Sequence, residues 1–313
     1  MRAIGVKEYG GPEALQEVDL PAEAIGAGQV RVRVTAAAVN PADTLRRAGL
    51  YSTTDHPEEG VDVPGMDVAG VVTEVGPGVS TGVAIGDQVM GIVQPFRTHG
   101  GYREDIVLPA RSVVAVPAGA TDIAAATLPM NGLTALQAMD LLALDPGQVL
   151  AVTGAAGAVG GYVVQLAKAA DLTVVADASE ADEDLVRTLG ADVVVRRGPD
   201  LAQRFRAQFP DGVDGLADGA LLDAAILPAV RDGGAVATFR GYTGNGQRGL
   251  RVTPVMVNIY AEEREKLDSL RYLAEEGKVT LRVADSYPAE QAAEAHRRFE
   301  AGGVRGRLVL VFD

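Results

Sequence analysis

Residues 149–170 limit the choice of fold more than any other part of this sequence. They predict a β-branched strand, then a glycine-rich turn, then an uncharged first half of a helix. The same alternation continues along the chain, and strands that alternate with helices are typical of a doubly wound α/β unit with a parallel sheet. The predicted elements are strands at Val149–Thr153, Thr173–Ala176, Val193–Val195 and Ala235–Phe239, and helices at about 158–170 and 181–189.

The turn after the first of these strands has the context that a dinucleotide-binding fingerprint requires, because it follows a strand and opens a helix. Its spacing is Gly154-x-x-Gly157-x-x-Gly160. Small residues let the backbone approach a pyrophosphate, and the amides at a helix start can donate hydrogen bonds to it. The alternative is a plain strand–helix turn in a chain that has 38 glycines. We expect the coenzyme to contact Gly154, Ala155, Ala156, Gly157, Ala158, Val159 and Gly160.

Side chains near the second and third strands of this unit favour different coenzymes. Asp177 lies 23 positions after Gly154, and an acid there commonly binds the ribose hydroxyls, which favours NAD(H). Four acids between positions 180 and 184 add negative charge that the 2′-phosphate of NADP(H) would oppose. Ser179 and the pair Arg196-Arg197 favour that phosphate instead. Since the acids also suit a solvated helix start and the arginines an ordinary surface, the residues alone leave the coenzyme open.

The flanking parts of the chain predict a β-rich unit. Val30–Val34 alternates with period two, Val68–Val75 predicts a strand closed by a glycine–proline turn, and Arg307–Phe312 predicts a last strand. Short strands at this spacing are typical of a barrel-like or sandwich-like unit. We therefore expect residues 1–118 and 253–313 to form one domain, with residues 119–252 inserted as the dinucleotide-binding domain.

Charge and composition exclude several classes of function. The chain has 28 basic and 42 acidic side chains, a net charge of −14, which argues against nucleic acid or an anionic membrane as the main partner. It has no Cys, which excludes disulfides, thiolate zinc sites and a cysteine nucleophile. The N-terminus lacks the apolar stretch of a signal peptide, so we expect a cytoplasmic protein.

A series of short motifs runs in order over nearly all of the chain. They are Val39-Asn40-Pro41-Ala42-Asp43, Gly49-Leu50-Tyr51, Pro64 to Val72, Gly86-Asp87-Gln88-Val89, Gly100-Gly101-Tyr102, Asn131 to Ala135, the Ala155–Gly160 loop, Leu189-Gly190-Ala191-Asp192 and Gly306 to Leu310. With these motifs the chain resembles the zinc-independent medium-chain dehydrogenase/reductases of the quinone oxidoreductase (zeta-crystallin-like) group. This resemblance implies a GroES-like substrate domain, closed by the C-terminal segment, a Rossmann domain, an active site in the cleft and a homodimer.

Zinc-binding members of the same superfamily carry their ligands where this chain does not. They have a Cys near the position of Asn40, a His-Glu pair near Met66-Asp67 and a Cys near Met130-Asn131, and zinc is bound by thiolate, imidazole and carboxylate groups. The three histidines of this chain, His56, His99 and His296, are far apart in sequence. We therefore expect a mechanism that uses no metal.

Without a metal or an obvious strong base, alcohol oxidation is less suited to this chain than hydride delivery to an electron-poor acceptor. Such delivery needs orientation and help for the developing oxyanion. The leading hypothesis is an NAD(P)H-dependent reductase of quinones, and the first alternative is an enoyl or enone reductase. A coenzyme-binding scaffold or sensor with little turnover is a further alternative. Fold analogy alone does not choose between these substrates.

The resemblance assigns roles to single residues. Tyr51 is the expected hydrogen-bond donor to the substrate, and Asn40 is expected to donate its amide to the substrate or the nicotinamide. Thr134 and Phe239 are expected at the nicotinamide, although each also suits ordinary packing. NADP(H) is slightly favoured over NAD(H), because relatives of this kind mostly use NADPH; Arg196 would then cover Asp177 and, with Ser179, hold the 2′-phosphate. Tyr102 is expected to pack at a strand edge, Asp43 to cap a turn or helix, and His99 to lie on the surface.

Overall fold

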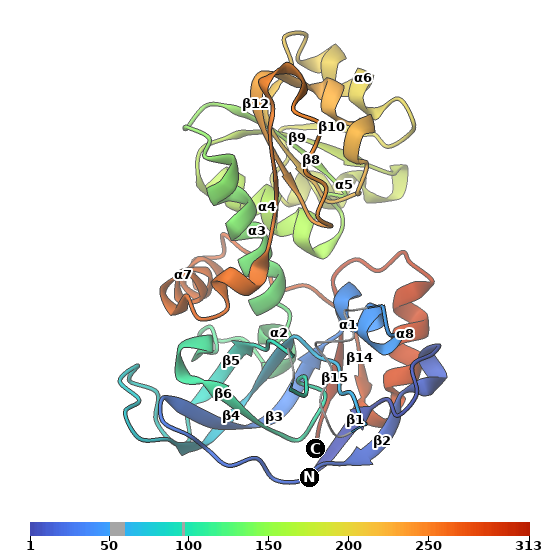
Figure 1. Cartoon of the computed structure of the whole chain (residues 1–313). Coiled ribbons are helices and arrows are strands. Elements are labelled where there is room, and N and C mark those ends of the chain that lie inside the picture. Colours follow the sequence, from blue (N-terminus) through green and yellow to red (C-terminus); the bar gives the residue numbers. More distant parts are fainter. Residues whose placement is uncertain (51–59, 96–97) are drawn as a thin grey trace. The chain divides into compact units, whose positions relative to one another are not determined.

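The computed structural model describes residues 1–50, 60–95 and 98–313. The chain divides into two compact units, each of which has its own sheet (Figure 1). The first contains Met1–Met130, Asn258–Glu276 and Leu281–Asp313, and the second contains Asn131–Val257 and Gly277–Thr280. The chain therefore leaves the first unit, forms the second, returns to the first at Asn258 and enters the second once more over Gly277–Thr280.

The first unit is built on a seven-stranded sheet in the order β14-β15-β3-β4-β5-β7, with β6 paired to β3. In β3 the side chains of Val30, Val32 and Val34 are buried and alternate with Arg31 and Arg33, as the period-two pattern predicts. The strands are β3 (Gln29–Ala38), β4 (Asp67–Val75), β5 (Gln88–Ile92), β6 (Asp105–Pro109), β7 (Val113–Ala115), β14 (Val283–Pro288) and β15 (Arg307–Val311), with a separate pair β1 (Arg2–Gly5) and β2 (Gln16–Asp19).

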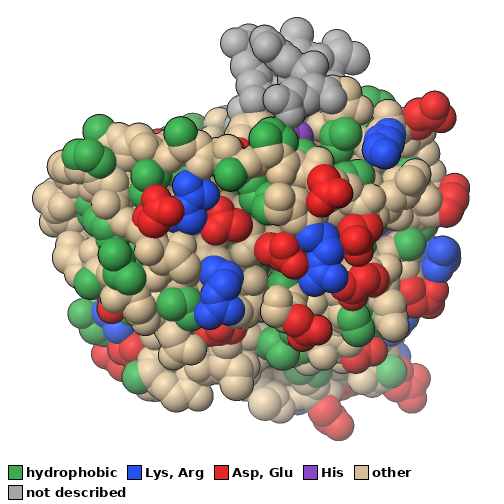
Figure 2. All heavy atoms as spheres, turned by 90° about the horizontal axis from the view of Figure 1, so that it is seen from below, with side chains coloured by type: hydrophobic (Ala, Val, Ile, Leu, Met, Phe, Trp, Pro, Cys, Tyr) green, Lys and Arg blue, Asp and Glu red, His purple; other side chains and the backbone are tan. Residues whose placement is uncertain are grey.

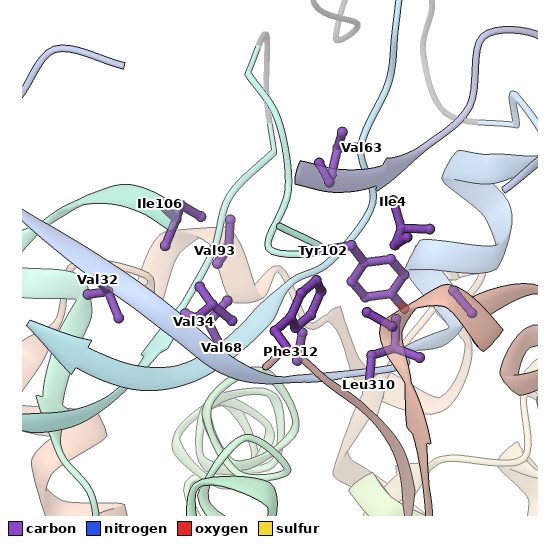
Figure 3. Packing of buried hydrophobic residues seen from close by; sticks show 14 of the residues in the cluster. Ile4, Val32, Val34, Val63, Val68, Val93, Tyr102, Ile106, Leu310 and Phe312 are labelled. Carbon is purple, nitrogen blue, oxygen red and sulfur yellow. The ribbon is translucent and has the colours of Figure 1, made fainter. Parts of the chain in front are cut away.

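The C-terminal strand is part of the core of this unit. β15 runs antiparallel to β3 and parallel to β14, and Leu310 and Phe312 lie in one apolar cluster with Val34 and Tyr102 (Figure 3). The helices of the unit are α1 (Pro41–Arg47), α2 (Asp122–Ala125), α7 (Arg264–Glu275) and α8 (Ala292–Glu300). On the face shown in Figure 2, acidic and basic side chains are interspersed, and no basic patch is visible there.

The second unit is a six-stranded parallel sheet in the order β10-β9-β8-β11-β12-β13. Its core includes Ala151, Val175, Phe205, Leu216 and Val236, which are buried. Such a sheet aligns the carboxyl ends of its strands at one edge, where ligands of doubly wound sheets bind. The elements are β8 (Val149–Thr153), α4 (Ala158–Ala169), β9 (Thr173–Ala178), α5 (Glu183–Thr188), β10 (Val193–Arg196), α6 (Leu201–Gln208), β11 (Val213–Asp218), β12 (Val230–Thr238) and β13 (Arg251–Pro254), with α3 (Pro129–Leu142) leading into the sheet.

The predicted fold class, a GroES-like β-rich domain with a Rossmann parallel sheet, is confirmed. Residues 122–142 contain two helices, α2 and α3, separated by residues 126–128. The structure keeps residues 119–130 with the first unit and returns to that unit at Asn258.

Candidate active site

The glycine-rich turn after β8 has the geometry of an anion cradle. Gly154 has φ +67°, which glycine adopts without strain, and Gly157 is the N-cap of α4. A Cβ at Gly160 would lie 2.4 Å from the carbonyl oxygen of Gly154, so only glycine lets α4 start this close to the loop. The helix cannot supply acceptors for the amides of its first turn, at Ala158, Val159 and Gly160. These amides therefore fit the pyrophosphate of a dinucleotide.

The carboxylate of Asp177, within β9 at the same edge of the sheet, is completely buried. Its Oδ1 accepts hydrogen bonds from the amides of Gly154, at 2.6 Å, and Ala155, at 3.3 Å. Its Oδ2 accepts from Nε of Arg197 at 2.8 Å. The carboxylate therefore joins the glycine loop to the end of β10, and its negative charge is paired.

Arg196 and Ser179, which were expected to hold the 2′-phosphate of the coenzyme, have other partners. Arg196 pairs with Glu180, with 3.3 Å between Nη1 and Oε2. The hydroxyl of Ser179 donates to Asp182 at 2.6 Å. Arg196 was expected to cover Asp177, but the ion pair with Asp177 is made by Arg197.

The two residues expected at the nicotinamide also lie in the second unit. Thr134 is buried on α3, and Phe239 is half-buried directly after β12. Asp218 ends β11, where its carboxylate accepts from the hydroxyl of Thr153 at 2.7 Å and from the amide of Asp223. Polar side chains thus follow the carboxyl ends of several adjacent strands.

In the first unit, Asn40 and Asp67 form a buried pair. Asn40 is the N-cap of α1, and its Nδ2 donates to Oδ2 of Asp67 at 2.7 Å and to the carbonyl of Ala38 at 3.4 Å. The other oxygen of Asp67 accepts from the amide of Met130 at 2.6 Å. Burial raises the pKa of Asp67 to about 7, although both hydrogen bonds oppose this shift. This carboxyl can therefore hold or release a proton close to neutral pH.

A second buried chain of hydrogen bonds connects α1 to the C-terminal segment. Asp43 accepts from the amides of Asn40 and Gly65, and burial raises its pKa to about 6. The hydroxyl of Tyr102 lies 3.3 Å from Oδ2 of Asp43 and 3.2 Å from Nε2 of His296.

Arg47 influences the protonation state of His296, the histidine in this series of hydrogen bonds. Its Nη1 lies 3.4 Å from Nδ1 of His296, and burial together with this cation lowers the pKa of His296 to about 3. The ring is neutral, and we assign its proton to Nε2, because Nδ1 faces a donor. His296 then donates to the hydroxyl of Tyr102, which donates to Asp43.

Asn40, Asp43 and Tyr102 are all engaged in hydrogen bonds within the protein. Asn40 already uses its amide hydrogens within the protein, so donation to a substrate would require it to exchange one of these bonds. Asp43 joins α1 to residue 65 and Tyr102, and Tyr102 carries hydrogen bonds as well as packing. His99 is buried rather than exposed, so that expectation is wrong. Tyr51 lies outside the described residues.

Sequence reasoning gave no role to Asp67 or His296, and of the pair Arg196-Arg197 it assigned the cover of Asp177 to Arg196, whereas Arg197 contacts it. Asp67 had a detectable signal, a charged residue that opens a strand directly before the apolar run 68–72. His296 had none, because its partner Tyr102 lies 194 positions away. Within the described ranges, no three His, Cys, Asp or Glu side chains gather as a potential metal-binding group. In those ranges every helix is too short or too polar to cross a lipid bilayer.

Comparison with known proteins agrees with this architecture. Residues 26–118 match the family model of the alcohol dehydrogenase GroES-like domain, and residues 189–310 match that of the zinc-binding dehydrogenases. An NADPH-dependent alkenal/one oxidoreductase of Arabidopsis thaliana is 30% identical, over 99% of this chain and 79% of the relative. A chloroplast envelope quinone oxidoreductase homolog of the same plant is 29% identical, over 99% of this chain and 98% of the relative.

Solved structures give the same result. An NAD-dependent alcohol dehydrogenase superposes with a TM-score of 0.87 at 31% identity, covering 100% of both chains. A mycobacterial protein complexed with NADPH superposes with a TM-score of 0.85 at 28% identity, again covering 100% of both. The chain is therefore an oxidoreductase of the medium-chain dehydrogenase/reductase family, and it belongs to the quinone oxidoreductase (zeta-crystallin-like) group.

Proposed function

We propose that this protein transfers a hydride from NADPH to a quinone without a metal. The observation that carries the proposal is the amide-lined turn Gly154–Gly160, in a chain similar to a quinone oxidoreductase homolog and to an NADPH-dependent reductase. The coenzyme supplies the hydride. The loop residues bind its pyrophosphate, and Thr134 and Phe239 hold the nicotinamide. Tyr51 and Asn40 orient the acceptor. We also propose that the protein is a cytoplasmic homodimer.

Reduction of an α,β-unsaturated carbonyl is the second candidate, and it is favoured by the similarity to an alkenal/one oxidoreductase. This reaction uses the same hydride step and adds a proton to the neighbouring carbon. Asp67 is a group in the first unit that can hold a proton near neutral pH.

The test follows oxidation of NADPH and NADH by absorbance, with a panel of quinones and a panel of enones at equal concentrations. The proposal expects turnover with NADPH and quinones, and no turnover by the Gly157→Asp variant. Turnover with enones alone would replace the first candidate with the second. No turnover in either panel, with coenzyme bound, would favour the scaffold or sensor.

A further inference from the structure

The inference concerns how the coenzyme is selected, and it rests on the proposed use of a nicotinamide dinucleotide. An acid near the end of the second strand usually binds the ribose and so selects against a 2′-phosphate. Asp177 occupies this position, but its environment differs from that of a ribose ligand. Its side chain is completely buried, Oδ1 takes two loop amides and Oδ2 takes Arg197. The carboxylate therefore serves to fix the loop and Arg197.

Arg197 is held in place yet still has donors to offer. Its amide donates to the carbonyl of Ala178 at 2.8 Å, and its Nε donates to Asp177 at 2.8 Å. The side chain is 45% exposed. Among the residues that the structure describes, its two Nη groups have no hydrogen-bond partner. A guanidinium anchored through Nε presents these two groups as a fork, the geometry that binds a phosphate through two hydrogen bonds.

The surrounding charges allow a phosphate at this place. Arg197 cancels the charge of Asp177, and Arg196 is paired with Glu180 on the adjacent surface. Ser179 has its hydroxyl on Asp182 and so is committed within the protein. Both arginines retain guanidinium donors, but they are held differently. Arg197 is fixed through Nε by a fully buried carboxylate, whereas Arg196 reaches only the exposed Glu180, so Arg197 is the one with a defined position at this edge of the sheet.

We propose that Arg197 binds the 2′-phosphate of NADP(H) directly and that Asp177 is its anchor, so this acid supports NADPH use rather than opposing it. The anchor also extends to the pyrophosphate loop, because the same carboxylate accepts from Gly154 and Ala155. Selection of the phosphate and the shape of the loop are therefore connected through one side chain.

The test measures binding of 2′,5′-ADP and of 5′-AMP by calorimetry, so it does not depend on any acceptor substrate. The wild-type chain is expected to bind 2′,5′-ADP more tightly. Arg197→Ala should weaken 2′,5′-ADP about tenfold or more, the loss of one charge-assisted pair, and change 5′-AMP less than about threefold. Arg196→Ala, the matched control on the next residue, should leave the ratio of the two affinities unchanged.

A double variant separates direct contact from charge cancellation. If Arg197 only cancels Asp177, the Arg197→Ala/Asp177→Asn chain should bind 2′,5′-ADP as tightly as Asp177→Asn alone, and this result would overturn the proposal. If Arg197 contacts the phosphate, the double variant should stay several-fold weaker than Asp177→Asn. Thermal unfolding of each variant checks that the fold is retained.

Other outcomes are equally decisive. An unchanged ratio in Arg197→Ala, or an effect of the same size in Arg196→Ala, would overturn the assignment. Normal nucleotide selection without reduction of any quinone or enone would refute the proposed function and leave this inference standing. If the wild-type chain binds neither nucleotide, the assignment of a nucleotide site to this edge of the sheet is wrong.

Discussion

Replacing Asp67 by Asn should change how the stability of the first unit depends on pH. The side chain is buried between Asn40 and the amide of Met130, and its pKa rises from 3.8 to about 7 on folding. Between these values the folded chain keeps a proton that the unfolded chain has lost. The contribution of protonated Asp67 to the free energy of unfolding is therefore complete below about pH 4 and is lost as the pH rises through about 7.

The size of the effect follows from the shift. Each pH unit in this interval costs about 1.4 kcal/mol per group. From pH 5 to pH 8 only the first two units count, so Asp67 should cost the wild type about 3 kcal/mol of unfolding free energy. Because Asn does not titrate, the variant should gain this amount relative to wild type over the same range, whatever its stability at pH 5.

Urea unfolding followed by circular dichroism, at half-unit steps from pH 5 to pH 8, measures this difference directly. Asp43→Asn is the matched comparison, because Asp43 has a pKa of about 6 and should show only about 1 kcal/mol over the range. A difference between wild type and Asp67→Asn that stays constant within about 1 kcal/mol would refute the argument that burial dominates at this carboxyl.

Four further predictions test other parts of the structure and the metal-free mechanism. Gly157→Asp should abolish NADPH binding, because it puts a carboxylate where the coenzyme phosphate would lie. Its melting temperature should stay close to that of the wild type, since Asp is a good N-cap and its Cβ meets only the Gly154 oxygen, at 3.1 Å. If calorimetry shows an NADPH affinity within about threefold of wild type, the coenzyme site has been misplaced. Gly160→Ala should instead lower the melting temperature, because its Cβ clashes with that oxygen at 2.4 Å. Tyr102→Phe should cost about 1–3 kcal/mol in urea unfolding, because Asp43 and His296 each lose a partner, and a loss below about 0.5 kcal/mol would contradict this. Finally, elemental analysis should find no stoichiometric zinc and a chelator should leave activity unchanged; one zinc per chain on which activity depends would overturn the metal-free mechanism.

The sequence predicted β8, β9 and β10 of the second unit because these strands are rich in β-branched residues, and it predicted α4 and α5 because they begin at recognisable turns. Strand β14 was not predicted, because Val283–Pro288 is mostly exposed and pairs on one side only, with β15, so burial imposes no pattern on it. The β14 segment therefore resembles a loop in sequence. Patterns that depend on burial predict central strands better than edge strands.

The glycine loop and Asp177 could be placed from the sequence because their spacing is local. The sequence could not show whether Arg196 or Arg197 covers Asp177, because this choice depends on where β10 ends. Tyr102 and His296 meet only through the tertiary fold, and the motif that contains Tyr102 does not indicate this partner. Long-range pairs of single polar residues leave no periodic signal.

The pairing of β15 with Ala36–Ala38 of β3 has a consequence for synthesis on the ribosome. Roughly 270 residues separate the two strands, so at ordinary translation speeds β3 waits about 15 to 50 seconds for this partner. By then the residues of the six-stranded sheet have all emerged. The end of β3 leads directly to Asn40 and Asp43, and α8 with His296 also arrives late. The hydrogen-bonded chain through Tyr102 is therefore completed among the last events of folding, and the nascent chain must keep an apolar strand edge from other chains until then.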